Sequence, residues 1–135
     1  MKIKCLLSAI VISSSCLADV AVIVHPSNNN VLDSSIVSRI FLGKEKSFAD
    51  GNQTVPVNQE EGNAVTEEFN ADVLNKSSSQ LKAYWSKLVF TGKGSPPIDV
   101  ANDADVIKLI ATNPNMIGYV DASKVDDSVK VVGTF

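Results

Sequence analysis

The alternation of apolar and polar stretches along the chain predicts strands that alternate with helices. Residues 20–24 are five consecutive apolar residues, mostly β-branched, which is typical of a buried strand. Residues 54–57 predict a second strand, and Pro56 lacks a backbone donor there, so we expect this strand to be short or at a sheet edge. Residues 116–120 and 129–132 predict two late strands.

Apolar residues at helical spacing fill the intervals between these strands. Asp33 or Ser34 can cap the first predicted helix, and Asn102 or Asp103 can cap the last. Val65, Phe69 and Val73 recur every four residues, which predicts a helix over residues 63–74. This order of elements predicts an α/β domain with a mixed sheet flanked by helices.

A further helix is predicted from a capping box, in which Ser77 precedes Gln80 by three residues. The apolar residues of this helix are Leu81, Tyr84, Trp85, Leu88 and Val89. Aromatic residues at helical spacing usually belong to a core. We therefore expect Tyr84 and Trp85 to be core residues; the alternative is that they stack on a ligand.

The first 18 residues predict a signal peptide. Lys2 and Lys4 precede a short apolar run, and small residues lead to Ala18. Cleavage after Ala18 would leave residues 19–135 as one domain in the periplasm. Lipid attachment at Cys16 is an alternative, although Ser13 occupies the position where lipoprotein signals carry a branched aliphatic residue.

Charge and composition exclude several functions for the expected mature chain. Without Lys2 and Lys4 it has 10 basic and 15 acidic residues, a net charge of −5, which argues against nucleic acid as a partner. Its single histidine, His25, and its lack of cysteine argue against a zinc site. It also has no Gly-x-Ser-x-Gly motif to hold a nucleophile, so we expect no catalytic residues and no cofactor.

The candidate ligand-binding segment lies between the second strand and the following helix. Free backbone N–H groups at such a helix start can bind an anion. The alternative is ordinary helix capping by Asn63, and the nearby Glu60 and Glu61 would repel a dianion. The candidate binding residues are Asn58, Gln59, Gly62, Asn63, Ala64, Val65 and Thr66. Ser27 and Asn28, which follow the first strand, are secondary candidates.

Four stretches resemble a known family. They are residues 20–26 (Val-Ala-Val-Ile-Val-His-Pro), residues 40–44 (Ile-Phe-Leu-Gly-Lys) followed by Asp50-Gly51, residues 84–97 with Tyr84-Trp85 and the Phe-Thr-Gly-Lys-Gly-Ser-Pro-Pro loop, and residues 113–120 (Asn-Pro-Asn-Met-Ile-Gly-Tyr-Val). In this order they resemble the phosphate-type substrate-binding proteins of ABC transporters. The resemblance implies that residues 19–135 form one periplasmic-binding-protein-like domain with a type II periplasmic-binding fold, of which this chain supplies mainly one lobe.

The resemblance also implies where a ligand would bind and how this chain differs. Phosphate-binding relatives carry Arg-x-Asp-Gly-Ser-Gly-Thr after the second strand. Counted back from Phe69, Gln59 takes the place of the Arg and Glu61 that of the Asp, and Asn63, Ala64 and Val65 replace Ser-Gly-Thr. The guanidinium that would grip an oxyanion through two hydrogen bonds is therefore missing.

Two functions stay open from the sequence. One is a non-catalytic solute-binding protein for an ABC transporter, whose ligand is a small anion such as phosphate and whose partners are the membrane subunits of the transporter. The other is a periplasmic interaction or accessory module that has kept the lobe, lost phosphate binding and contacts another envelope protein.

Overall fold

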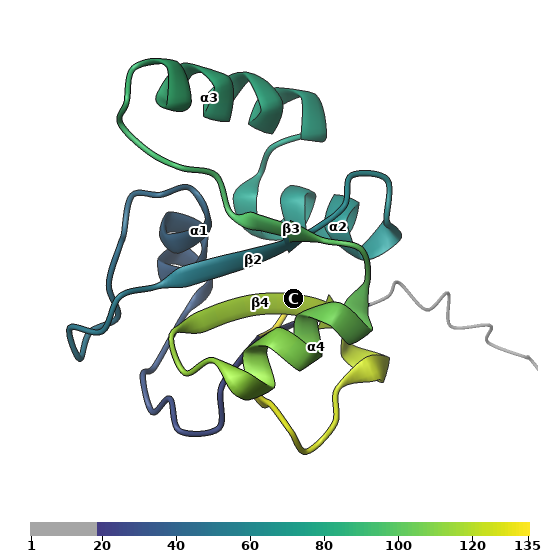
Figure 1. Ribbon diagram of the computed structural model, residues 1–135. Helices are drawn as coiled ribbons and strands as arrows, with labels where there is room; N and C mark the ends of the chain where they lie inside the picture. Colours follow the sequence, from purple (N-terminus) through teal and green to yellow (C-terminus); the bar gives the residue numbers. More distant parts are fainter. Residues whose placement is uncertain (1–18) are drawn as a thin grey trace, which may run out of the picture.

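The computed structural model describes residues 19–135, so the predicted signal peptide and Cys16 lie outside the described residues. The elements follow one another as β1 (Val20–Val24), α1 (Ser34–Phe41), β2 (Val55–Gln59), α2 (Ala64–Phe69), a π-helical turn η1 (Asn70–Leu74), α3 (Ser78–Phe90), β3 (Ile98–Val100), α4 (Asp103–Thr112), β4 (Met116–Asp121), a 3₁₀ turn η2 (Ala122–Lys124) and β5 (Lys130–Thr134) (Figure 1). Within residues 19–135, no helix has the length and apolar character needed to cross a bilayer.

The five strands form one mixed sheet in the order β3-β2-β4-β1-β5. β2 runs parallel to β3 and to β4, while β1 runs antiparallel to β4 and β5. The α/β fold with a mixed sheet predicted from the sequence is thus confirmed. The carboxyl ends of β2, β3 and β4 meet at one end of the sheet, where parallel strands commonly position ligands.

β1 shows why both faces of the sheet must be covered. All five of its residues are buried. Side chains alternate between the two faces of a strand, and Val20, Val22 and Val24 join the core under α1 and α2, whereas Ala21 and Ile23 join the core under α4. The uninterrupted apolar run of β1 is therefore explained by helices that cover both faces of the sheet. Figure 1 shows α4 on one face and α1 and α2 on the other.

Three aromatic rings form the centre of the larger core. The Phe69 ring stacks on Tyr119, with centroids 3.9 Å apart, and meets the edge of Phe41 at 4.8 Å. Val65 and Val73, the other members of the predicted helical stripe, are also buried. These contacts fix α2 and the adjoining η1 turn against the sheet.

Of the two alternatives expected for a strand with Pro56, a short strand or an edge strand, the edge position is not the one found. β2 lies between β3 and β4 rather than at the sheet edge. β3 pairs with β2 only from Val57 onward, so no residue of β3 pairs with Pro56. The missing N–H of Pro56 is therefore compatible with an inner strand.

α3 stands apart from the rest of the domain (Figure 1). It begins with the predicted capping box of Ser77 and Gln80, but none of its residues is fully buried. The expectation that Tyr84 and Trp85 are core residues is wrong in this respect. The Tyr84 hydroxyl donates to the Leu42 carbonyl at 2.5 Å, and Trp85 lies over Gly43, so the aromatic pair attaches α3 to the end of α1. Tyr84 is half-buried and packs against the edge of the larger core.

Candidate functional site

The segment from Asn58 to Thr66 forms a tight turn at the carboxyl end of β2. Gly62 has a φ of +95°, a conformation that glycine adopts without strain. Asn63 is the N-cap of α2, yet its side chain makes no capping hydrogen bond. The first N–H groups of a helix have no carbonyl partner within that helix. The Asn63 side chain therefore does not cap α2 in the ordinary way.

Asn63 instead ties the turn to the neighbouring loop. Its side-chain nitrogen donates to the Ala101 carbonyl at 2.9 Å and to the Gln59 side-chain oxygen at 3.3 Å. Thr66 likewise bonds locally, since its hydroxyl donates to the Glu60 carbonyl at 3.0 Å. The side chains of Asn63 and Thr66 thus hold the shape of the turn.

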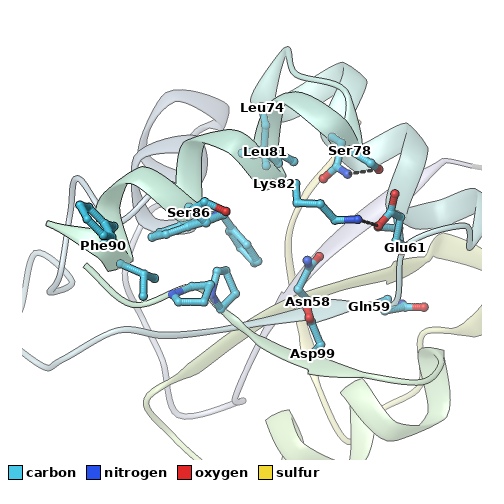
Figure 2. A pocket seen from close by; sticks show the side chains of 17 residues that line it. Asn58, Gln59, Glu61, Leu74, Ser78, Leu81, Lys82, Ser86, Phe90 and Asp99 are labelled. Carbon is cyan, nitrogen blue, oxygen red and sulfur yellow. Dashed lines mark hydrogen bonds and ion pairs between the residues drawn. The ribbon is translucent and has the colours of Figure 1, made fainter. Parts of the chain in front are cut away.

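Gln59 is buried, and its side chain forms hydrogen bonds within the protein. It is only 1% exposed, and its side-chain nitrogen donates to Asp103 Oδ1 at 2.7 Å and to the Tyr119 carbonyl at 3.0 Å. Figure 2 shows the Asn58 side chain extending toward α3 while the Gln59 side chain turns away from it. Neighbouring residues of a strand point to opposite faces, so Asn58 and not Gln59 offers its side chain to solvent-accessible space.

A carboxylate of the protein already lies at the turn. Glu67 Oε1 accepts a hydrogen bond from the Gly62 N–H at 3.4 Å and a second from the Ser78 hydroxyl at 2.8 Å. Glu61 forms an exposed ion pair with Lys82, whose atoms lie 3.4 Å apart. Glu61 and Glu67 therefore have structural partners, and Glu67 accepts the Gly62 N–H that an external anion would need.

Tyr119 forms the floor beneath the turn. Its hydroxyl donates to Asn58 Oδ1 and accepts from the Gln59 N–H at 3.2 Å. Burial raises the pKa of Tyr119 to about 12, because a phenolate would lose its hydration there. Tyr119 is therefore a neutral donor at physiological pH, and it keeps the Asn58 oxygen engaged.

A cavity of about 610 Å³ opens between α3 and the strands β2 and β3. Three of the predicted residues line it: Asn58, Gln59 and Thr66. Gly62, Asn63, Ala64 and Val65 do not line it, although they belong to the adjacent turn. Most of the remaining wall is apolar and comes from α3 and from the loop before β3, including Leu81, Trp85, Val89, Phe90, Pro96 and Pro97.

The secondary candidates lie far from this site. β1 runs antiparallel to β4, so its end at Val24 pairs with Ile117, near the start of β2. Ser27 and Asn28 follow that end, at the opposite end of the sheet from Gln59. Ser27 bonds to the ring of His25 and Asn28 to Asn30, which are local turn contacts.

No sequence pattern directly indicated the cavity wall formed by α3. Asn70, Ser78, Lys82 and Asp99 all line the cavity, but no sequence motif joins them. One indirect sign was present: five apolar residues at helical spacing on α3, for which the sequence offers no obvious partner. β3 is only three residues long and was not predicted at all.

Comparison with known proteins rests on structure alone. No protein-family profile matches the sequence, and no curated protein matches it. A phosphate ABC transporter substrate-binding protein from Clostridium perfringens, solved with bound phosphate, matches with a TM-score of 0.67 and 24% identity over 85% of this chain and 45% of its own. An ABC-type phosphate transport receptor from Vibrio cholerae matches with a TM-score of 0.67 and 16% identity, over 85% of this chain and 46% of its own.

A third match is PstS from Borrelia burgdorferi, with a TM-score of 0.64 and 14% identity over 86% of this chain and 47% of its own. The chain spans less than half the length of these three structures. Their agreement over most of this chain establishes the architecture on which the turn and the cavity are built. The chain therefore has the fold of one lobe of the phosphate ABC transporter substrate-binding proteins.

Proposed function

We propose that this protein is a non-catalytic solute-binding domain of the periplasm that binds a small oxyanion of the phosphate type at the turn between β2 and α2. The observation that carries the proposal is the uncapped start of α2, which adjoins an open cavity in a fold shared with phosphate-binding transport proteins. Backbone N–H groups arranged in this way favour anions.

The proposed site is weaker than one built around an arginine. Gln59 stands where phosphate-binding relatives carry the Arg of their motif, and its amide is bonded inside the protein. Glu67 competes for the Gly62 N–H. We therefore propose that a tight complex needs a second surface bearing positive charge, supplied by the part of the cleft that the relatives build from their remaining length or by a membrane subunit of an ABC transporter.

Isothermal titration calorimetry with phosphate and sulfate tests this proposal. Replacing Glu67 by Gln removes the competing charge while keeping the shape of the side chain, so phosphate affinity is expected to rise by about fivefold. Asp72→Asn is the matched control, because Asp72 lies exposed in η1 away from the turn and its loss changes the net charge equally.

Two results would overturn the proposal. One is the absence of heat with millimolar phosphate for both the folded wild type and Glu67→Gln. The other is an equal gain of affinity in Glu67→Gln and Asp72→Asn, which would indicate only a change in overall charge. In the first case, recovery of an envelope protein on the immobilised domain would favour the interaction-module alternative.

A further inference from the structure

Positive charge is concentrated on α3 and the loops that flank it. Residues 76–98 contain four lysines and no acidic residue. The rest of residues 19–135 has six basic and 15 acidic residues, a net charge of −9. A basic segment of net charge +4 is therefore joined to an acidic body, and its helix stands out from the sheet (Figure 1).

The two lysines nearest the carboxyl end of α3 have no partner of opposite charge. Lys82, in the first half of the helix, forms an ion pair with Glu61 of the body. Neither Lys87 nor Lys93 forms an ion pair among residues 19–135, and both are exposed. Their charges are therefore available to an external anionic surface.

Phe90 lies between these two lysines in the sequence, at the last position of α3. Its side chain is 93% exposed, which is unfavourable for an aromatic ring in water. Figure 2 shows Phe90 at the end of α3 that lies away from Glu61. Lys87 precedes Phe90 by three residues, so the two side chains lie on the same side of the helix.

Two backbone hydrogen bonds fix the chain that follows the helix. The Gly92 N–H donates to the Val89 carbonyl at 3.1 Å. The Lys93 N–H donates to the Leu88 carbonyl at 2.9 Å. Gly92 has a φ of +69°, the left-handed conformation that this type of helix ending requires. Lys93 is thereby held against the last turn of α3, at the same end of the helix as the exposed ring.

A lipid bilayer fits this arrangement better than a folded protein partner does. Protein-binding surfaces usually offer a contiguous apolar patch of several hundred Å², whereas the exposed large apolar residues of α3 are only Val89 and Phe90. A fluid lipid surface closes around a single inserted side chain, and its phosphates attract the lysines beside it. The same surface repels the acidic body, which orients the domain with α3 toward the bilayer.

We propose that the carboxyl end of α3, residues 87–93, docks on an anionic phospholipid bilayer. The Phe90 ring inserts between the lipid headgroups, and the ammonium groups of Lys87 and Lys93 contact lipid phosphates. This docking does not depend on oxyanion binding at the β2–α2 turn, because it uses no residue of that turn.

Co-sedimentation with vesicles tests the proposal, using purified protein whose amino terminus has been determined by mass spectrometry. One set of vesicles contains equal amounts of phosphatidylglycerol and phosphatidylcholine, and the other contains phosphatidylcholine alone. We expect binding to the anionic vesicles to be tighter by about tenfold or more, and to weaken by about tenfold when NaCl rises from about 50 to about 300 mM. Inorganic phosphate should release no more protein than chloride at equal ionic strength, which separates this surface from an oxyanion site.

Variants at exposed positions separate the roles of the ring and of the lysines. Phe90→Ala should weaken binding to anionic vesicles by about tenfold. Val31→Ala is its matched control, because Val31 is an apolar residue of the body with 90% exposure. Lys87→Gln should weaken binding by about fivefold. Lys108→Gln, on α4, changes the net charge equally and should leave binding unchanged.

The proposal is overturned if neutral and anionic vesicles bind the protein equally, if Phe90→Ala binds as tightly as Val31→Ala, or if Lys87→Gln and Lys108→Gln behave alike. Absence of binding to either kind of vesicle also overturns it. Phe90-dependent capture of an acidic envelope protein would then identify the surface as a protein-docking site. Phosphate calorimetry on the same sample shows separately whether the β2–α2 turn binds an oxyanion.

Discussion

The Tyr119 hydroxyl donates a hydrogen bond to the side-chain oxygen of Asn58 and so connects the aromatic core to the floor of the cavity. Tyr119 lies in β4 and Asn58 in β2, and the same hydroxyl also accepts the Gln59 N–H. One side chain therefore joins the stacked ring of Phe69 to the end of the strand that leads into the candidate binding turn. The stability of the core and the shape of the site are coupled at this point.

Replacing Tyr119 by Phe should destabilise the fold by about 2 kcal/mol, because it leaves the buried Gln59 N–H and the Asn58 oxygen without this partner. Urea unfolding followed by circular dichroism measures the effect. Tyr84→Phe is the matched control: it also removes one hydroxyl, but from a half-buried position. We expect Tyr84→Phe to lower the free energy of unfolding by less than Tyr119→Phe does. A larger decrease in Tyr84→Phe would contradict this role of Tyr119.

Stability should depend on alkaline pH through Tyr119. Its pKa is raised from 10.0 to about 12 by burial. Between these values the unfolded chain releases a proton that the folded protein retains, so the stabilisation is complete below pH 10 and disappears as the pH rises through 12. The whole effect amounts to about 2–3 kcal/mol.

Urea unfolding at a series of alkaline pH values, in wild type and Tyr119→Phe, measures this contribution. The difference between the two proteins isolates Tyr119 from the lysines, which titrate in the same range. Equal slopes of stability against pH in both proteins would show that Tyr119 ionises normally in the folded state.

Truncation to alanine should reduce stability strongly at one helical phenylalanine and hardly at all at another. Phe69 is fully buried between Phe41 and Tyr119, and Phe69→Ala is expected to cost about 3–5 kcal/mol. Phe90 is 93% exposed at the end of α3, and Phe90→Ala should change stability by less than about 0.5 kcal/mol. Thermal unfolding of both variants tests this, and a large loss in Phe90→Ala would mean that α3 packs closer to the body.

The export proposal predicts a processed amino terminus. Expression in a bacterial host with an envelope, followed by mass spectrometry of the periplasmic fraction, should give a protein that begins at Asp19. Lipid attachment would instead give a protein that begins at Cys16 and partitions into detergent. An intact chain retained in the cytoplasm would contradict both forms of export.

Local sequence signals were sufficient for most of the fold. The buried run of β1 and the caps Asp33, Ser77 and Asn102 are all confirmed, because these features depend on residues that are close in the sequence. Of the two alternatives expected from Pro56, the edge position is wrong, because the length of β3, which decides whether a backbone N–H is needed at residue 56, is a property of a distant segment. Tyr84 and Trp85 were misassigned because spacing defines an apolar face but not what covers it.

The sequence indicated a candidate turn between β2 and α2, but not how the groups of that turn are hydrogen-bonded. The partners of Gln59, namely Asp103 and the Tyr119 carbonyl, lie more than 40 residues away, so nothing local indicated that its amide is used internally. The contact of Glu67 with the Gly62 N–H also depends on the three-dimensional path of the turn. The cavity under α3 was missed for the same reason, since its walls come from separate segments.

A phosphate titration followed by amide NMR shows directly whether the β2–α2 turn binds an oxyanion. We expect progressive shifts of the backbone N–H signals of residues 62–66, with Glu67 responding as its carboxylate is displaced from Gly62. Absence of shifts at these residues, or shifts confined to the exposed lysines elsewhere on the surface, would show that the β2–α2 turn is not an oxyanion site.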